Sequence, residues 1–217
     1  MNLLLACATE IEAAPLRGRI NLLDGIELVI TGVGLVEACA VLAERIASAP
    51  PPDLMIGLGV GGGFGHSGVG LLDICLAESE IIADLGVPSG NRVLPFRGMT
   101  APPPVEFGAD RTLLASFNTL LRGLDITPRV GPFVSVNAVT ASDKRMEGLF
   151  AQYQPVCENM EGAALARVAQ GALIPWLEVR CISNLVGRRE RGKWQIDAAS
   201  ARLAEVAAPC LAKMVQL

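Results

Sequence analysis

The chain has 217 residues, enough for one sizeable hydrophobic core but short for two full domains. It is 51% hydrophobic, 18% charged and only 4% aromatic, with a formal net charge of -4. A nucleic-acid partner normally requires a basic surface, so this composition argues against one and favours a small-molecule ligand or another protein chain.

The first eight residues are apolar except for Asn2, they lack the basic lead of a secretory signal, and the apolar run stops at Glu10 and Glu12. We therefore predict a buried first strand. No apolar run reaches the roughly 18 residues that a membrane-spanning helix needs. We expect a soluble, cytoplasmic protein without a membrane partner.

Strand and helix patterns then alternate along the chain, which indicates an α/β fold. Strands are expected at residues 2–8, 26–31, 53–58, 71–83 (one long strand or a bent pair), 130–139, 155–159 and 176–183. Helices are expected from Glu10 onward and at residues 35–48, 110–123, 143–152, 160–170 and 197–215. Residues 86–108 are rich in Gly and Pro, which indicates an excursion or lid. We predict a single domain over residues 1–217, with a twisted, mixed but largely parallel central sheet flanked by helices.

Cysteine and histidine usage limits the possible chemistry. The six cysteines form no C-x-x-C pair, and most lie in apolar segments, so we predict reduced structural thiols. His66 is the single histidine, which gives a His-based zinc site or a Ser-His-Asp triad little support. We expect neither a metal nor an organic cofactor.

The most informative segment is residues 157–164, in which Glu161 lies where a strand gives way to a helix. Asn159 can cap that helix and place Glu161 in its first turn, a position that favours glutamate on dipole grounds alone. The small apolar residues that follow indicate a buried helix end. A buried carboxylate requires hydrogen-bond donors, and a ribose diol supplies two. Glu161 is therefore a candidate for sugar binding.

Two more polar positions follow predicted strands. Asn184 ends strand 176–183, where Ser183 can orient it, and Glu12 or Glu10 follows the first strand. In a right-handed strand–helix–strand unit the ends of the two strands share one edge of a parallel sheet. We therefore expect Glu161, Asn184 and Glu12 to face one crevice.

A glycine-rich segment, residues 57–65, contains a G-x-G-x-x-G match at Gly57, Gly59 and Gly62. No helix pattern follows, and the match falls on the third strand, so a dinucleotide site is not favoured. Glycines here allow the backbone to approach a ligand, and we predict that Val60 and Gly61 line the site. The basic loop 187–194 follows Asn184, so Arg188 or Arg189 is a candidate for contacting an acidic substrate group.

Together these segments resemble the purine nucleoside phosphorylase and nucleosidase superfamily, over nearly the whole chain. The resemblance implies that Glu161 binds the ribose hydroxyls, that Met160 packs beneath the sugar and that Glu12 activates an attacking water. It also implies that Val139 and Thr140 line the base pocket. Homo-oligomers are common among such proteins.

Within that superfamily, residues 182–191 with Trp194 resemble the futalosine hydrolase family, which implies release of hypoxanthine from futalosine in menaquinone biosynthesis and a benzoate contact for Arg188 or Arg189. Methylthioadenosine/adenosylhomocysteine nucleosidases typically carry Asp where this chain has Asn184. An amide can donate to O6 and accept from N7–H of a 6-oxopurine, whereas a carboxylate cannot donate. Asn184 therefore indicates hypoxanthine as the leaving base.

Hydrolysis is favoured over phosphorolysis because phosphorylases need cations for phosphate, and residues 53–70 contain neither Arg nor Lys. Three alternatives stay open. They are an adenosine-type nucleosidase acting on methylthioadenosine, adenosylhomocysteine or aminodeoxyfutalosine, an inosine-type phosphorylase, and a nucleotide-sensing or dinucleotide-binding module without catalysis.

Overall fold

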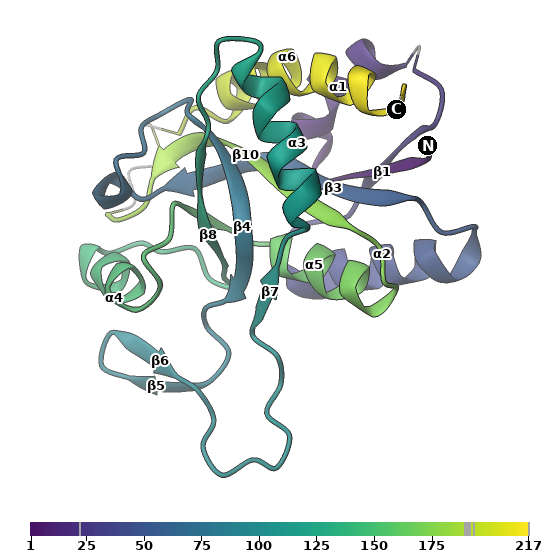
Figure 1. The fold of residues 1–217 in the computed structure, drawn as a ribbon. Helices are drawn as coiled ribbons and strands as arrows, with labels where there is room; N and C mark the ends of the chain where they lie inside the picture. The colour runs from purple at the N-terminus through teal and green to yellow at the C-terminus, as the bar shows by residue number, and fades with distance from the viewer. Residues whose placement is uncertain (22, 189–191, 193, 217) are drawn as a thin grey trace.

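The computed structural model describes residues 1–21, 23–188, 192 and 194–216 (Figure 1). Its main sheet is built from β1 (Leu3–Cys7), β2 (Ile26–Ile30), β3 (Leu54–Gly63), β4 (Ile74–Ile82), β7 (Glu106–Gly108), β8 (Arg129–Ser135), β9 (Cys157–Asn159) and β10 (Trp176–Leu185). The helices are α1 (Glu10–Ile20), α2 (Leu35–Ser48), α3 (Arg111–Arg122), α4 (Asp143–Tyr153), α5 (Gly162–Gly171) and α6 (Ile196–Met214), and a 3-10 turn lies at Gly65–Ser67.

The sheet is mixed and partly closed. β3, β10, β4, β8 and β9 form a ring, because β9 returns to pair with β3, and β1 and β2 extend the sheet from β3. β1, β2, β3 and β10 run parallel, whereas β4 is antiparallel to β10 and β9 is antiparallel to β3. The sheet is therefore mixed, as expected, but it is partly closed and not clearly largely parallel. A parallel return needs a crossover of about a dozen residues or more, usually a helix, and the short β3–β4 connection provides none.

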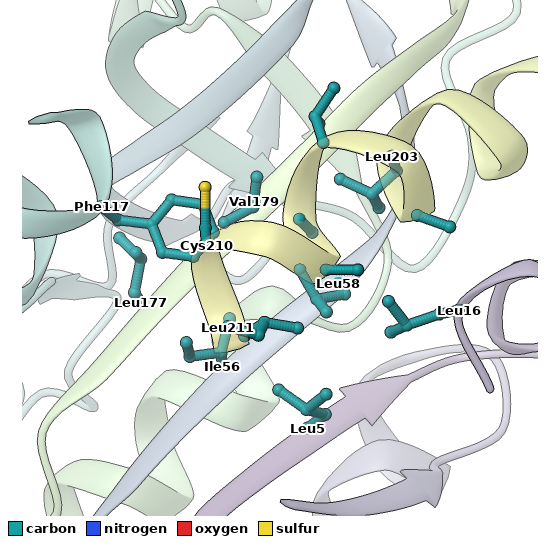
Figure 2. Close-up of a cluster of buried hydrophobic side chains, with 14 of the residues drawn as sticks. Leu5, Leu16, Ile56, Leu58, Phe117, Leu177, Val179, Leu203, Cys210 and Leu211 are labelled. Atoms are coloured by element: carbon teal, nitrogen blue, oxygen red, sulfur yellow. The ribbon is translucent and has the colours of Figure 1, made fainter. Parts of the chain in front are cut away.

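Helices cover both faces of the sheet (Figure 1). α1, α3 and α6 pack on one face, and α2 and α5 pack on the other. Figure 2 shows the first of these cores, in which side chains of α3 and α6 meet the sheet; its labelled residues are Leu5, Leu16, Ile56, Leu58, Phe117, Leu177, Val179, Leu203, Cys210 and Leu211. Burial of these apolar side chains on alternate strand positions stabilises the sheet that carries the site.

Several segments differ from the sequence-based expectation. The third strand was expected to end at residue 58, but β3 continues through the glycine-rich segment to Gly63, with β10 on one side and β9 on the other. Residues 71–83 contain one strand, and the strand expected at 130–139 ends at Ser135. In each case pairing with distant strands decides where the strand ends.

The expected excursion at residues 86–108 contains the hairpin β5 (Val87–Ser89) and β6 (Arg92–Leu94), which projects from the body in Figure 1. Its last residues form β7, which pairs with β4. No helix in the described part of the chain is long and apolar enough to cross a lipid bilayer.

Candidate active site

A cavity of about 240 Å³ opens beside the carboxyl ends of β1, β3 and β10. It gathers eight of the side chains or backbone positions singled out from the sequence: Glu12, Val60, Gly61, Val139, Met160, Glu161, Ser183 and Asn184. Its lining is completed by Ala8, Thr9, Ile11, Val33, Gly62, Glu158, Asn159, Arg180, Trp194 and Ile196. Segments that are far apart in the chain therefore meet at one concave surface.

These segments meet for a different reason from the one expected. β9 does not run parallel to β10, so the ends of the two strands do not share the edge of a parallel sheet. Instead β9 runs back along β3, with Cys157 opposite Gly63 and Glu158 opposite Gly62, and the chain continues toward the middle of β3. Arg180 of β10 lies opposite Gly59 there. Closure of the sheet is what brings Glu161 to Arg180.

Glu12 is held in the pocket by the start of α1. Thr9 is the N-cap residue, and Thr9 and Glu12 form a capping box. Glu12 Oε2 accepts hydrogen bonds from the Thr9 backbone N at 3.0 Å and the Thr9 hydroxyl at 2.8 Å, and Glu12 Oε1 accepts one from the Val60 N at 2.9 Å. Glu10 instead lies on the surface, where it pairs with Arg17 at 2.9 Å. The structure thus places Glu12 in the cavity and Glu10 outside it.

Glu161 is the N-cap residue of α5, one position before the helix begins. Asn159 Oδ1 accepts hydrogen bonds from the backbone N of Glu161 and Gly162, so Asn159 satisfies the helix start and leaves the Glu161 side chain to point elsewhere. Glu161 Oε1 accepts from the Gly34 N at 3.1 Å, and Oε2 accepts from Arg180 Nη2 at 3.3 Å. Burial raises the pKa of Glu161, while Arg180 and the Gly34 N–H oppose that shift.

Arg180 is the residue that the sequence reasoning missed. Its guanidinium donates to Glu178 Oε1 at 2.6 Å and to the Val60 carbonyl at 3.1 Å, and it lies 3.8 Å from Glu12. Burial alone lowers the pKa of Arg180, but the surrounding carboxylates outweigh it and raise that pKa overall. The signal was present: Glu178 and Arg180 are charges of opposite sign two positions apart on an otherwise apolar strand, so both face the same side.

The glycines of β3 provide the space for these charges. A Cβ at Gly59 would lie 2.5 Å from Arg180 Nη1 and 2.6 Å from Glu12 Oε1, and one at Gly57 would lie 3.3 Å from Glu178 Cγ. We expected these glycines to admit a ligand. Gly57 and Gly59 instead admit the protein's own charged side chains, because a larger residue at either position would displace the ion-pair network.

Asn184 lies opposite Gly62 at the end of β10 and is partly exposed to the cavity. The Ser183 hydroxyl lies 2.9 Å from Asn184 Oδ1 and 3.3 Å from the Gly61 carbonyl oxygen. Within the described part of the chain, the hydrogen bond of Asn184 Nδ2 is a long one, 3.4 Å to the Leu185 carbonyl. The amide is therefore oriented by its oxygen, and its NH2 group is available to a ligand.

Two other predicted positions, Thr140 and Arg188, do not line the cavity. Thr140 is buried and donates through its backbone N to Glu158 Oε1 at 2.9 Å and through its hydroxyl to Glu158 Oε2, so it holds the loop that carries Val139. Arg188 is exposed, and its backbone N donates to Asp143 Oδ1 at 3.0 Å, which ties this part of the loop to α4. Arg189 lies outside the described residues.

The cysteines do not contribute to the pocket lining. All six are free, and burial is the main factor that raises the pKa of Cys7, Cys75 and Cys181 to about 12 and that of Cys210 to about 11. Such thiols stay protonated and poorly reactive. Among the described residues, no group of three or more His, Cys, Asp or Glu side chains is arranged to hold a metal ion.

Comparison with known proteins defines the class. The sequence profile described as the phosphorylase superfamily matches residues 14–216, so the chain belongs to this superfamily.

Within it, the chain is 34% identical over 151 residues to the futalosine hydrolase of Acidothermus cellulolyticus, covering 69% of this chain and 61% of that protein. It is 32% identical over 197 residues to the futalosine hydrolase of Streptomyces coelicolor, covering 84% of this chain and 77% of that protein. Among solved structures, the 5′-methylthioadenosine/S-adenosylhomocysteine nucleosidase of Helicobacter pylori superposes with a TM-score of 0.86 at 17% identity, covering 98% of each chain. At that identity the likeness establishes the fold alone.

Proposed function

We propose that this protein is a nucleosidase that hydrolyses the N-glycosidic bond of futalosine and releases hypoxanthine. The observation that carries the proposal is the amide of Asn184 in a cavity that also contains Glu12 and Glu161. The similarity to two proteins named futalosine hydrolase supports the same substrate. Menaquinone biosynthesis by the futalosine route is the corresponding pathway.

Glu161 and Met160 bind the ribose. A carboxylate can accept hydrogen bonds from both hydroxyls of a diol, and the raised pKa of Glu161, caused mainly by burial, reflects a carboxylate short of solvent and suited to such donors. Arg180 and the Gly34 N–H hold that carboxylate from the other side. Hydrogen bonds from the ribose hydroxyls thus offset the free-energy cost of desolvating the Glu161 carboxylate.

Asn184 recognises the base. Its Nδ2 donates to O6, and its Oδ1, held by the Ser183 hydroxyl, accepts from N7–H as N7 becomes protonated. Adenine has an amino donor in place of O6, so an adenine edge leaves the amide donor facing another donor. A mispaired buried polar edge discriminates by orders of magnitude.

Glu12 activates the water. The glycosidic bond breaks with oxocarbenium character at C1′, the bonding electrons leave with the base, and water adds to C1′. Glu12 accepts the proton of that water, and its capping-box bonds to Thr9 fix the carboxylate in place. Val60 and Gly61 of β3 and Val139 form the walls of the site.

The decisive experiment is a nucleoside panel with and without phosphate, in which the liberated base is separated by chromatography. We expect hypoxanthine from futalosine in the absence of phosphate and much slower release of adenine from methylthioadenosine. A requirement for phosphate would make the protein a phosphorylase. Faster adenine release would make it an adenosine-type nucleosidase, the activity for which the superposed Helicobacter pylori protein is named.

Loss of the sugar-binding carboxylate tests the site itself. Glu161→Gln should lower turnover by about a thousandfold, since it removes an acceptor that strengthens as charge develops on the sugar. Glu10→Gln is the matched control, because Glu10 is exposed and lies outside the cavity. Near-normal turnover in Glu161→Gln would remove Glu161 from the mechanism.

We also propose that the protein acts as a homo-oligomer in the cytoplasm. Three exposed apolar side chains support an interface beside the cavity: Ile11 is 57% exposed, Val33 53% and Val36 76%. Light scattering coupled to size-exclusion chromatography tests this, and a monomer at micromolar concentration would contradict it.

A further inference from the structure

Two buried carboxylic acids, Glu80 and Glu178, are not used by the proposed mechanism. Glu80 of β4 and Glu178 of β10 are each 0% exposed, and β4 and β10 are neighbouring strands. Ionised carboxylates in a dry interior are costly unless each oxygen is paired. Their partners therefore indicate in which state they are held.

Glu80 is fully engaged by neutral donors. Its Oε2 accepts from the Ser135 hydroxyl at 2.7 Å, and its Oε1 accepts from Asn159 Nδ2 at 2.6 Å. The side-chain amide of Asn159 cannot be flipped, because its Oδ1 already accepts hydrogen bonds from the backbone N of Glu161 and Gly162, and both would be lost.

Glu178 is engaged on one side only. Its Oε1 accepts from Arg180 Nε at 2.6 Å, whereas its Oε2 is buried without a hydrogen-bond partner among the described residues. A Cβ built on Gly162 would contact both Glu178 Oε2 and Glu80 Oε1. The unpaired oxygen of Glu178 therefore converges with Glu80 Oε1 over the same glycine.

Charge balance requires a proton at this point. Arg180 already faces the carboxylates of Glu178, Glu161 and Glu12, so it cannot also neutralise Glu80. Two ionised carboxylates that converge in a low-dielectric interior repel each other strongly, and one of the pair keeps its proton.

We propose that Glu80 and Glu178 share one proton as a carboxyl–carboxylate pair, and that this pair is the positioning group for Arg180 and, through it, for Glu161. The hydrogen bond between Glu80 Oε1 and Glu178 Oε2 supplies the partner that Glu178 lacks. The pair reaches Glu161 by two routes. Glu178 holds Arg180, which donates to Glu161 Oε2, and Glu80 holds Asn159, which accepts from the Glu161 N.

The proton has a definite consequence for folding. Burial, reinforced by the charge of Glu178, raises the pKa of Glu80 well above its ordinary value of 4.5, while Ser135 and Asn159 oppose the shift. Among the described residues, Arg180 of β10, the Cys157 thiol of β9 and the Glu161 carboxyl group at the start of α5 are the other titratable groups nearby. Above pH 4.5 the native pair therefore holds a proton that the unfolded chain has released, so stability falls as pH rises through that window.

The test compares the wild type with Glu178→Gln in urea unfolding from about pH 5 to about pH 8. The amide introduced by Glu178→Gln reproduces the protonated pair permanently: its oxygen accepts from Arg180 Nε, and its NH2 group donates to Glu80 Oε1. The folding equilibrium constant of the variant relative to wild type should rise about tenfold per pH unit. Glu44→Gln, an exposed change on α2, should give a ratio independent of pH. A pH-independent ratio for Glu178→Gln would overturn the proposal.

Infrared spectroscopy gives a second measurement that needs no activity. The wild type at neutral pH should show the stretching band of a protonated carboxyl group, and Glu178→Gln should lack it. Identical spectra for the two proteins would contradict a shared proton. That result is expected if a water molecule separates two ionised carboxylates.

The positioning role is tested by comparing conservative and truncating variants. Glu178→Gln should have a kcat close to that of the wild type, whereas Glu178→Ala should have a much lower kcat. Glu80→Gln should be worse than Glu178→Gln, because it sets an amide donor against Asn159 Nδ2. An equal loss of kcat in Glu178→Gln and Glu178→Ala would contradict the positioning role. The activity readout rests on the proposed function; if no nucleoside is hydrolysed, unfolding and infrared spectra still decide whether the proton is shared.

Discussion

The two faces of strands β3 and β10 have opposite characters although they share the same backbone. On the face toward α1, α3 and α6, the residues Ile56, Leu58, Leu177 and Val179 form a dry apolar core (Figure 2). On the face toward α2 and α5, the intervening positions hold glycines on β3 and the charged pair Glu178 and Arg180 on β10. Strand alternation allows one element to stabilise the fold and carry a charged site at once.

The difference shows how a buried ion network is accommodated. Burial of large aliphatic side chains on one face supplies stability in proportion to apolar area. Burial of charged groups on the other face costs free energy. Gly57 and Gly59 leave room for these groups to pair closely, and the close pairing offsets that cost. Changes on the apolar face should therefore lower stability alone, whereas changes on the charged face should lower activity as well.

The largest effect is expected from Arg180→Met, which leaves Glu12, Glu161 and Glu178 without their shared cation. Stability at neutral pH should fall by about 3–5 kcal/mol, because uncompensated buried carboxylates remain, and hypoxanthine release should be lost. Urea unfolding and base release measure the two effects. Arg202→Gln is the control, since Arg202 pairs with Glu205 at the surface and should matter little.

On the apolar face, Leu58→Ala should destabilise by about 2–5 kcal/mol, because Leu58 is only 1% exposed and its removal leaves a cavity. The kcat/KM of the remaining folded protein should stay within about threefold of wild type, since no charge on the opposite face moves. A fall in kcat/KM as large as that in Arg180→Met would show that the two faces are coupled.

A smaller and more selective effect is expected from Asn184→Asp at the cavity rim. Replacing the amide by a carboxylate removes the donor to O6, so the preference for hypoxanthine over adenine release should fall by about 1–3 kcal/mol, or roughly tenfold to a hundredfold. Competition between futalosine and methylthioadenosine measures this preference. Unfolding should be nearly unchanged because Asn184 is partly exposed; an unaltered preference would remove Asn184 from base recognition.

The smallest effect is expected in the pH profile of kcat/KM, whose acidic limb should lie at a higher pH than an ordinary glutamate would give. Burial is the main cause that raises the pKa of Glu161 above its ordinary value of 4.5, with Arg180 opposing it. If the ribose is bound by the ionised form, kcat/KM should rise with pH and reach half its maximum above pH 4.5. The same shift makes Glu161 lower the free energy of unfolding as pH rises from 4.5 to the raised pKa. A midpoint at or below 4.5 would contradict a desolvated Glu161.

Much of the local structure was predictable, because hydrophobic period and capping signals are local. The α1 start follows from the Thr9–Glu12 capping box, and the predicted helix at 197–215 differs from α6 by one residue at each end. The course of β3 beyond Leu58 was not predictable in this way. Glycines have weak strand propensity, and only pairing with β9 and β10 extends the strand to Gly63.

The candidate site was predictable in its residues but not in its connections. Glu12, Glu161 and Asn184 were found by their places after strands, and they do line one cavity. The spacing of Glu178 and Arg180 indicates that both side chains lie on one face of the strand, but only the contacts of Arg180 with Glu12 and Glu161 show that this face belongs to the site. Thr140 and Arg188 were misplaced because both lie on irregular segments whose paths depend on side-chain contacts, with Glu158 and Asp143 respectively.

By itself, the order of residues determined the α/β alternation, the apolar faces and the types of side chain available to grip a sugar and a purine, because each follows from short-range periodicity and chemistry. Only the tertiary structure decided that the sheet closes through β9, that one guanidinium serves three carboxylates and that Glu80 meets Glu178. Those outcomes depend on contacts between segments that can lie more than a hundred residues apart, where loop-closure entropy and packing, not local preference, select the arrangement.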